Sequence, residues 1–211
     1  MQEMLRILTV LLCLCAAPWG AALADDAQDV ARAMELLRKW EWPEALSAAG
    51  EPESVASDIV EWHRLRSGLG DAADVTGFLA RRPDWPGLAW LRRKSEAAIN
   101  VLPPDEIIAF YKELPPQSPE GVLSRARVLI AQGQKGDAEA ELVLAWRTMP
   151  MGRLIQANYL RQHKDLLTPH HNARLDRMLW DNHMVSARQM LSLVDDLAGY
   201  VATSGGKSVN N

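Results

Sequence analysis

The sequence predicts an all-α protein, an irregular α-solenoid of about ten short antiparallel helices. Three observations support this prediction. Apolar residues recur at helical spacing in short stretches, proline and glycine separate these stretches, and no segment shows the sustained alternation of polar and β-branched residues that indicates a strand. Each predicted helix has a single apolar face. Because such a face is buried only against a neighbour, the helices must stack.

Residues 1–24 have the pattern of a secretory signal peptide. Arg6 precedes an apolar run over residues 7–17, and Ala22-Leu23-Ala24 forms a cleavage site before Asp25. We therefore expect export to the periplasm. Both cysteines, Cys13 and Cys15, lie inside this segment, so the mature chain would contain no disulfide. No later apolar run has the length of a membrane span, so none is expected after signal removal.

Residues 25–49 predict two helices. The first carries an apolar face that extends to Leu37 and Trp40. The second restarts at Trp42-Pro43, where the proline suits a first helical turn.

Residues 57–99 predict three amphipathic helices joined by two sharp turns. Asp71 and Asp74 have the spacing of a helix-capping pair at the second of these helices. The apolar stripes are Ile59, Trp62, Leu65 and Leu69, then Val75, Phe78 and Leu79, then Leu88, Leu91, Ser95 and Ala98.

Proline and capping residues divide the remaining chain into further helices. Helices are predicted after Pro103-Pro104 and from Pro119, and Asp137 is predicted to cap the next one. Thr168 is predicted to cap a later helix, with Pro169 at its first position. The apolar residues expected on these faces include Val122, Ile130, Leu142, Trp146, Leu175, Met178, Leu179, Ala187, Met190 and Leu191. The predicted superhelical domain covers residues 25–200, and residues 201–211, poor in apolar side chains, are expected to be a disordered tail.

Few residue patterns indicate reaction chemistry. His163, His170 and His171 are close in sequence, but adjacent residues at a helix start point about 100° apart, so exposed or capping histidines are expected rather than a metal site. Capping is also the expected role of the carboxylate pairs Asp71/Asp74 and Glu139/Glu141. No cofactor, metal ligand or catalytic residue is predicted.

The charge distribution is uneven along the chain. The net charge is −4, which gives no indication of a nucleic-acid partner. Residues 25–58 hold nine acidic residues against three basic ones, whereas residues 61–94 hold seven basic residues against four acidic ones. Two interpretations remain open: the two segments pair with each other, or the basic segment forms a groove for an anionic polymer or acidic partner.

Six residues are predicted as possible contacts for a glycan or a protein partner. Most of the eight tryptophans fall on apolar stripes, where burial between helices is expected. Trp85 lies at a turn and Trp90 lies opposite its helix's apolar stripe, so these two are the candidates for exposure. The six predicted contact residues are Trp85, Trp90, Arg81, Arg82, Arg92 and Arg93.

Several segments together resemble a known family. They are WHRLRSG (residues 62–68), FLARRPDWPGLAWLRRKSEAA (78–98), AWRTMP (145–150), DLLTPHHNARLDRMLW (165–180) and SARQMLSLV (186–194). They are similar to the N-terminal superhelical, U-shaped region of soluble lytic murein transglycosylases. The resemblance covers most of residues 26–194. It implies an α-superhelix in the periplasm, and it implies peptidoglycan or a periplasmic cell-wall protein as partner.

The resemblance does not extend to the family's catalytic domain. That domain cleaves glycosidic bonds of peptidoglycan with a glutamate in an E-S-x-F-like motif, followed by a G-L-M-Q-L-like motif and a Tyr-Asn-Ala-Gly turn. None of these motifs occurs in residues 1–211, so no residue is assigned as catalytic and the chain is expected to be inactive alone. The sequence leaves open a truncated or frame-shifted copy and a natural short paralogue.

Two functions follow as expectations. The first is a scaffold that shapes the wall-facing groove and positions the glycan strand. The alternative is a standalone helical-repeat adaptor that binds a periplasmic protein.

Overall fold

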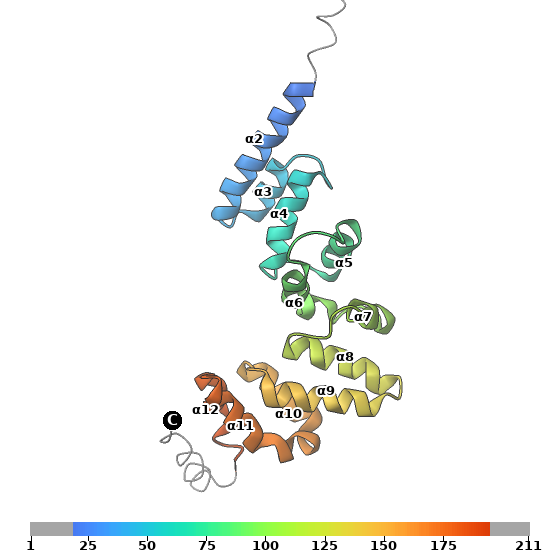
Figure 1. Cartoon of the computed structure of the whole chain (residues 1–211), viewed down its shortest axis with the longest axis vertical. Coiled ribbons are helices and arrows are strands. Elements are labelled where there is room, and N and C mark those ends of the chain that lie inside the picture. Colours follow the sequence, from blue (N-terminus) through green and yellow to red (C-terminus); the bar gives the residue numbers. More distant parts are fainter. Residues whose placement is uncertain (1–18, 195–211) are drawn as a thin grey trace, which may run out of the picture. The chain divides into compact units, whose positions relative to one another are not determined.

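The computed structural model describes residues 19–194, with side chains from residue 27 onward, and in that range it contains helices and no strand (Figure 1). The predicted all-α class is therefore confirmed. Residues 1–18 of the predicted signal peptide and the predicted tail at 201–211 lie outside the described residues. None of the helices in the described range is both long and apolar enough to cross a membrane.

The chain divides into two compact units, residues 1–95 and residues 96–211. The first contains α2 (Trp19–Arg38), α3 (Trp42–Ala48), α4 (Val55–Arg66), α5 (Ala72–Arg81) and most of α6 (Leu88–Ile99). The second contains α7 (Pro104–Phe110), α8 (Pro119–Ala131), α9 (Lys135–Thr148), α10 (Arg153–Leu167), the 3-10 turn η1 (Thr168–His170), α11 (His171–Trp180) and α12 (Met184–Met190). Each unit is described by itself.

In the first unit, α2, α3 and α4 pack together (Figure 1). Their shared core contains small side chains, Ala33, Ala45 and Ala49, together with Leu37 and Val60. Because alanine adds little bulk, the three helices approach one another closely. α5 packs on α4, and Val75 and Phe78 of α5 are fully buried.

The predicted caps of the central helices are confirmed. The Asp71 side chain accepts a hydrogen bond from Asp74 N at 2.9 Å, and the Asp74 side chain accepts one from Asp71 N at 3.1 Å. This reciprocal capping box satisfies two backbone donors that a helix start leaves unpaired. α4, α5 and α6 thus match the three helices that the sequence predicts over residues 57–99.

The second unit has a larger core. α9 packs on α8, α10 and α11, and α11 packs on α12. Trp146 of α9 stacks on Tyr159 of α10 with ring centroids 6.2 Å apart, and the Tyr159 hydroxyl donates to Pro119 O at 2.9 Å. The other fully buried side chains of this core include Leu142, Leu167, Leu175, Met178 and Met190.

A buried glutamate fixes the start of α8. The carboxylate of Glu96 accepts hydrogen bonds from Gln117 N at 2.7 Å and Ser118 N at 2.8 Å, and also from the Ser118 hydroxyl. Ser118 in turn caps α8 by accepting from Gly121 N. A Cβ at Gly121 would collide with the Glu96 carboxylate, so any other residue here would have to displace that carboxylate from its hydrogen-bond donors.

Several boundary predictions are wrong. Trp40 is not on α2, which ends at Arg38; it has a positive φ of 64° and is 68% exposed, since the chain turns there. Leu69 is 43% exposed because α4 has already ended and Gly68 turns the chain with φ of 78°. Asp137 is not a cap: α9 begins at Lys135, directly after the turn at Gly133, and Asp137 stands in its first turn.

A further cap prediction and several burial predictions are also wrong. Thr168 does not N-cap a helix but is the C-cap residue of α10, and its hydroxyl donates to Lys164 O at 2.8 Å. Pro169 lies in η1, so α11 starts only at His171. Several apolar residues expected on buried faces are instead exposed to solvent. They are Ile130, Leu179, Trp180 and Leu191.

Candidate functional site

The six predicted contact residues lie in the first unit, at the end of α5, in the following turn and on α6. Arg81 ends α5, Arg82 follows it, Trp85 lies in the turn, and Trp90, Arg92 and Arg93 lie on α6. The structure thus brings them onto neighbouring elements. It gives them different surroundings, which divide them into two groups.

Arg81 and Arg82 are bound to acidic residues of α4. Asp58 is fully buried, and its two carboxylate oxygens accept from Arg81 Nη2 at 2.9 Å and from Arg82 Nε. Arg81 Nη2 also lies 2.6 Å from Glu61 Oε2. Burial alone would lower the pKa of Arg81, but the hydrogen bond and charge of Asp58 raise it. At these residues the acidic and basic segments pair with each other, so both arginines stabilise the fold.

Trp85 and the turn around it also contribute to packing. Trp85 is half-buried, lies edge-on to Phe78 with centroids 6.1 Å apart, and has the Arg82 guanidinium 5.4 Å from its ring. The same turn is attached to α4, because Trp62 Nε1 donates to Pro86 O at 2.8 Å. These contacts hold the turn in one conformation.

Trp90 is different. It is 44% exposed, and Arg93 and Lys94 lie 5.6 Å and 5.0 Å from its ring. Both cations are exposed, and their spacing from Trp90 places all three residues on one side of α6. We call Trp90, Arg93 and Lys94 the α6 face. Arg92 is half-buried beside it. An exposed aromatic ring with two cations next to it can stack on a ring and pair with an anion.

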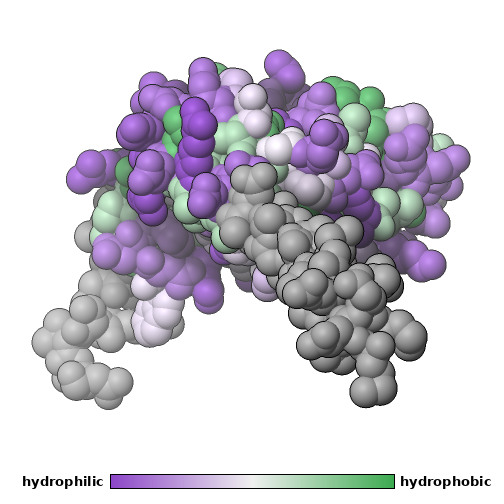
Figure 2. Space-filling model, turned by 90° about the horizontal axis from the view of Figure 1, so that it is seen from above, coloured by the Kyte–Doolittle hydropathy of each residue, from purple (hydrophilic) through white to green (hydrophobic). Residues whose placement is uncertain are grey.

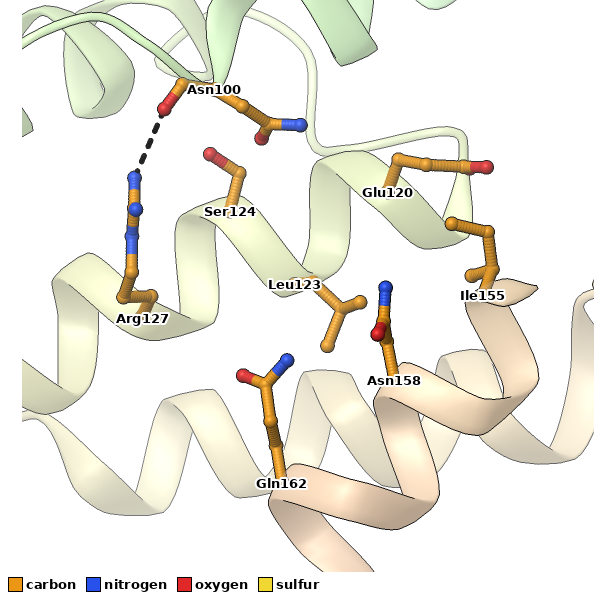
Figure 3. A pocket seen from close by; sticks show the side chains of 8 residues that line it. All are labelled: Asn100, Glu120, Leu123, Ser124, Arg127, Ile155, Asn158 and Gln162. Carbon is orange, nitrogen blue, oxygen red and sulfur yellow. Dashed lines mark hydrogen bonds between the residues drawn. The ribbon is translucent and has the colours of Figure 1, made fainter.

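The second unit contains a pocket that sequence reasoning did not find (Figure 3). Its volume is about 240 Å³, and it lies between α8 and α10 beside the end of α6. We call it the amide pocket. The residues that line it are Asn100, Glu120, Leu123, Ser124, Arg127, Ile155, Asn158 and Gln162.

The amide pocket is lined mainly by polar groups. Figure 3 shows the side chains of Asn158 and Gln162 extending from α10 toward α8. Arg127 Nη2 donates to Asn100 O at 3.1 Å and closes one edge. The Ser124 hydroxyl is buried and has no hydrogen-bond partner among the described residues. A ligand with both donors and acceptors would match this set of amides, hydroxyl and carboxylate.

The sequence contained a weak signal for this pocket. Glu120, Ser124 and Arg127 recur at helical spacing on one side of α8, and Asn158 and Gln162 do so on α10. The pattern alone does not show that these two sides face each other, since α8 and α10 are separated by α9 in the chain.

The remaining titratable candidates have structural partners. His171, expected to be exposed or capping, is buried, and its Nδ1 lies 3.0 Å from Leu193 O. Glu141 pairs with Arg125 at 2.7 Å, and Glu139 with Lys135 at 3.4 Å. Burial raises the pKa of Glu141, an effect opposed by Arg125. Within residues 19–194 no group of three or more His, Cys, Asp or Glu side chains could hold a metal ion.

Comparison with known proteins finds no match among protein-family models, curated proteins or solved structures.

Proposed function

We propose that the chain is an exported, non-catalytic helical protein that binds the glycan of peptidoglycan and positions it, in the manner of the superhelical region of soluble lytic murein transglycosylases. The α6 face carries this proposal. Trp90 exposes 44% of its surface, and two exposed cations lie beside its ring.

The chemistry of peptidoglycan fits this face. Its strands present sugar rings, whose C–H faces stack on indole, and its peptide substituents carry carboxylates, which pair with arginine and lysine. Trp90 would contact a sugar ring while Arg93 and Lys94 pair with carboxylates on either side of it. The signal-like segment at residues 1–24 and the sequence resemblance support the same compartment and the same polymer.

The amide pocket gives a second, weaker support. Amide, hydroxyl and carboxylate side chains are the groups that hydrogen-bond sugar hydroxyls and N-acetyl groups. Leu123 and Ile155 add apolar contacts on its walls.

Sedimentation with insoluble peptidoglycan tests the proposal. The wild-type protein should pellet at low salt and be released as salt screens the cations. Trp90→Ala and the double variant R93Q/K94Q should each leave at least tenfold more protein in the supernatant. Trp180→Ala is the matched control, because Trp180 is 85% exposed but lies on α11. Equal sedimentation of wild type and Trp90→Ala would overturn the proposal.

An adaptor function is the second candidate, and exposed apolar side chains favour it. Trp180, Met184 and Val185 are 85%, 45% and 70% exposed at the junction of α11 and α12. A protein-binding adaptor would stay in the supernatant with peptidoglycan, and Trp90→Ala would not affect it. A zymogram on purified peptidoglycan should show no clearing at the mass of this chain; a cleared band would contradict both candidates.

A further inference from the structure

A second pocket of the second unit lies between α10 and α12. Its volume is about 390 Å³. α10 contributes Arg153, Gln156, Ala157 and Leu160, whereas α12 and the residues after it contribute Arg188, Gln189, Leu191 and Ser192. We call it the α10–α12 pocket. Gln156 Nε2 donates to Gln189 O at 3.4 Å and connects its two walls.

The described residues that line the pocket include two arginines and no aspartate or glutamate. Arg153 and Arg188 both line it, and neither forms an ion pair with another residue in the described range. Arg153 is also the first residue of α10, whose N-cap, Gly152, supplies no side-chain hydrogen bond. The unpaired N–H groups and the positive dipole end of this helix therefore add to the charge of the two guanidinium groups.

A third guanidinium lies behind the pocket. Arg174 is fully buried, and its Nη2 donates to Oε1 of the pocket residue Gln156 at 3.5 Å. Its other hydrogen bonds go to the carbonyl oxygens of Trp146 and Met149, so no carboxylate balances its charge among the described residues. Burial lowers the pKa of Arg174 to about 10. An anion in the pocket would offset this uncompensated charge.

The remaining lining residues narrow the class of anion. Ala157, Leu160 and Leu191 give the pocket an apolar side. Gln189 Oε1 is buried and has no hydrogen-bond partner among the described residues. A ligand with an N–H donor could satisfy this oxygen. A carboxylate beside an amide N–H and a small aliphatic side chain has this combination of groups, and the C-terminal residue of a peptide provides it.

We propose that the α10–α12 pocket binds a carboxylate, that of the C-terminal end of a peptide, through Arg153 and Arg188. This pocket is separate from the α6 face, and the proposal does not depend on glycan binding. The chain itself offers a second source of the same chemistry, because Asp195 and Asp196 directly follow Val194 in the sequence.

The test is an NMR titration of the full mature chain with acetyl-Ala-Ala and, separately, with its C-terminal amide. The free acid should bind with a dissociation constant in the millimolar range, on the order of 1 mM for so small a ligand, and the amide at least tenfold more weakly. R153Q and R188Q should each weaken binding of the acid at least tenfold. R161Q is the matched control, because Arg161 is an exposed arginine of α10 that does not line the pocket.

The double variant D195N/D196N distinguishes the two sources of carboxylate. Tighter binding of acetyl-Ala-Ala by this variant would show that the chain's own carboxylates occupy the pocket in the wild type; unchanged binding would show that the ligand comes from another molecule. Equal binding of acid and amide, or acid binding unaffected by both R153Q and R188Q, would overturn the proposal. So would the absence of binding by the wild type and by D195N/D196N alike.

Discussion

The two units satisfy their buried charges with different kinds of partner. In the first unit the buried charge is the Asp58 carboxylate of α4, and two arginine side chains neutralise it. The second unit buries a cation, the Arg174 guanidinium of α11, whose hydrogen-bond partners are backbone carbonyls and an amide side chain. It also buries the Glu96 carboxylate, which accepts hydrogen bonds from backbone N–H groups and the Ser118 hydroxyl. Figure 2, which colours the surface by hydropathy, shows mainly hydrophilic side chains with scattered hydrophobic ones. Among the described residues, the Asp, Glu, Lys and Arg side chains that are buried are Asp58, Glu96 and Arg174.

The arginines of the two units differ in their contact with water and therefore in how they stabilise the fold. Arg81 and Arg82 are 23% and 29% exposed, so water shares in their solvation and the pair with Asp58 tolerates some rearrangement. Arg174 has no such contact with water. It binds the carbonyl oxygens of Trp146 and Met149 at the C-terminal end of α9, where the helix dipole is negative. Arg174 therefore serves as a side-chain cap of α9, and the guanidinium also lies 4.6 Å from the Trp146 ring.

The largest expected effect is that of Arg174→Ala. The substitution removes the hydrogen-bond donor from the buried carbonyl oxygen of Trp146 and the partly buried one of Met149, and it opens a cavity beside Trp146. The free energy of unfolding should therefore fall by about 3–5 kcal/mol. Urea unfolding followed by tryptophan fluorescence measures this. Arg174→Met, which restores volume but not hydrogen bonds, should recover only part of the loss. Arg177→Ala, on the exposed side of the same helix, is the control and should change stability little; full recovery by methionine would refute the capping role.

Asp58→Asn should have the next largest effect. It removes the buried charge that holds Arg81 and Arg82, but both guanidinium groups can turn toward water, so the expected loss is about 2–3 kcal/mol. Asp84→Asn provides a control, since Asp84 is an exposed carboxylate of the adjacent turn. Thermal unfolding at low and high salt measures the difference. A loss as large as that of Arg174→Ala would remove the contrast between the two units.

Glu96 is a buried anion bound by backbone N–H donors, whereas Arg174 is a buried cation bound by backbone carbonyl oxygens. Glu96→Gln tests how much the buried anion contributes to stability. A glutamine amide offers one acceptor and turns an N–H group toward the donors of Gln117 and Ser118, so a loss of about 1–2 kcal/mol is expected. Glu106→Gln, at an exposed position of α7, is the control. Hydrogen exchange at the start of α8 should speed up in Glu96→Gln alone.

The smallest effect is a pH dependence from one histidine in each unit. Burial lowers the pKa of His63, with Arg66 adding to the effect, and burial lowers the pKa of His163 against the opposing charge of Glu139. The unfolded chain therefore binds more protons near and below the ordinary histidine pKa of about 6.5, so stability should fall as the pH decreases from about 7 through this range. The double variant H63Q/H163Q should lose less stability than the wild type between pH 7.5 and 5.5. An equal loss would mean that other groups cause the pH dependence.

The sequence was sufficient for the helices whose boundaries depend on local chemistry. Pro119, the Asp71/Asp74 capping box and the stripe of Val75 and Phe78 all act within one or two turns, so their spacing predicts the structure directly. Asp137 misled the prediction because the turn at Gly133 lets α9 begin two residues before it.

The candidate sites depend on contacts that spacing does not reveal. Arg174 lies among polar residues of a helix in the sequence, and its burial follows from carbonyl oxygens of α9, which carry no residue-specific signal. The amide pocket requires that α8 and α10 face each other across 35 residues of chain, for example from Leu123 to Asn158. Sequence reasoning could identify Trp90 as a candidate for exposure because its position relative to one apolar stripe is a local property.

The contacts of the turn before α6 bear on how relatives of this chain would vary. Trp62 donates to Pro86 O, and the Arg66 guanidinium lies over the Trp62 ring at 4.3 Å and close to where a side chain at Gly87 would begin. Two segments that are 24 residues apart in the sequence thus form one interlocking unit. Homologues should therefore gain or lose Trp62, Arg66 and Gly87 together, and this coordinated substitution would serve as an evolutionary marker of the α4–α6 junction.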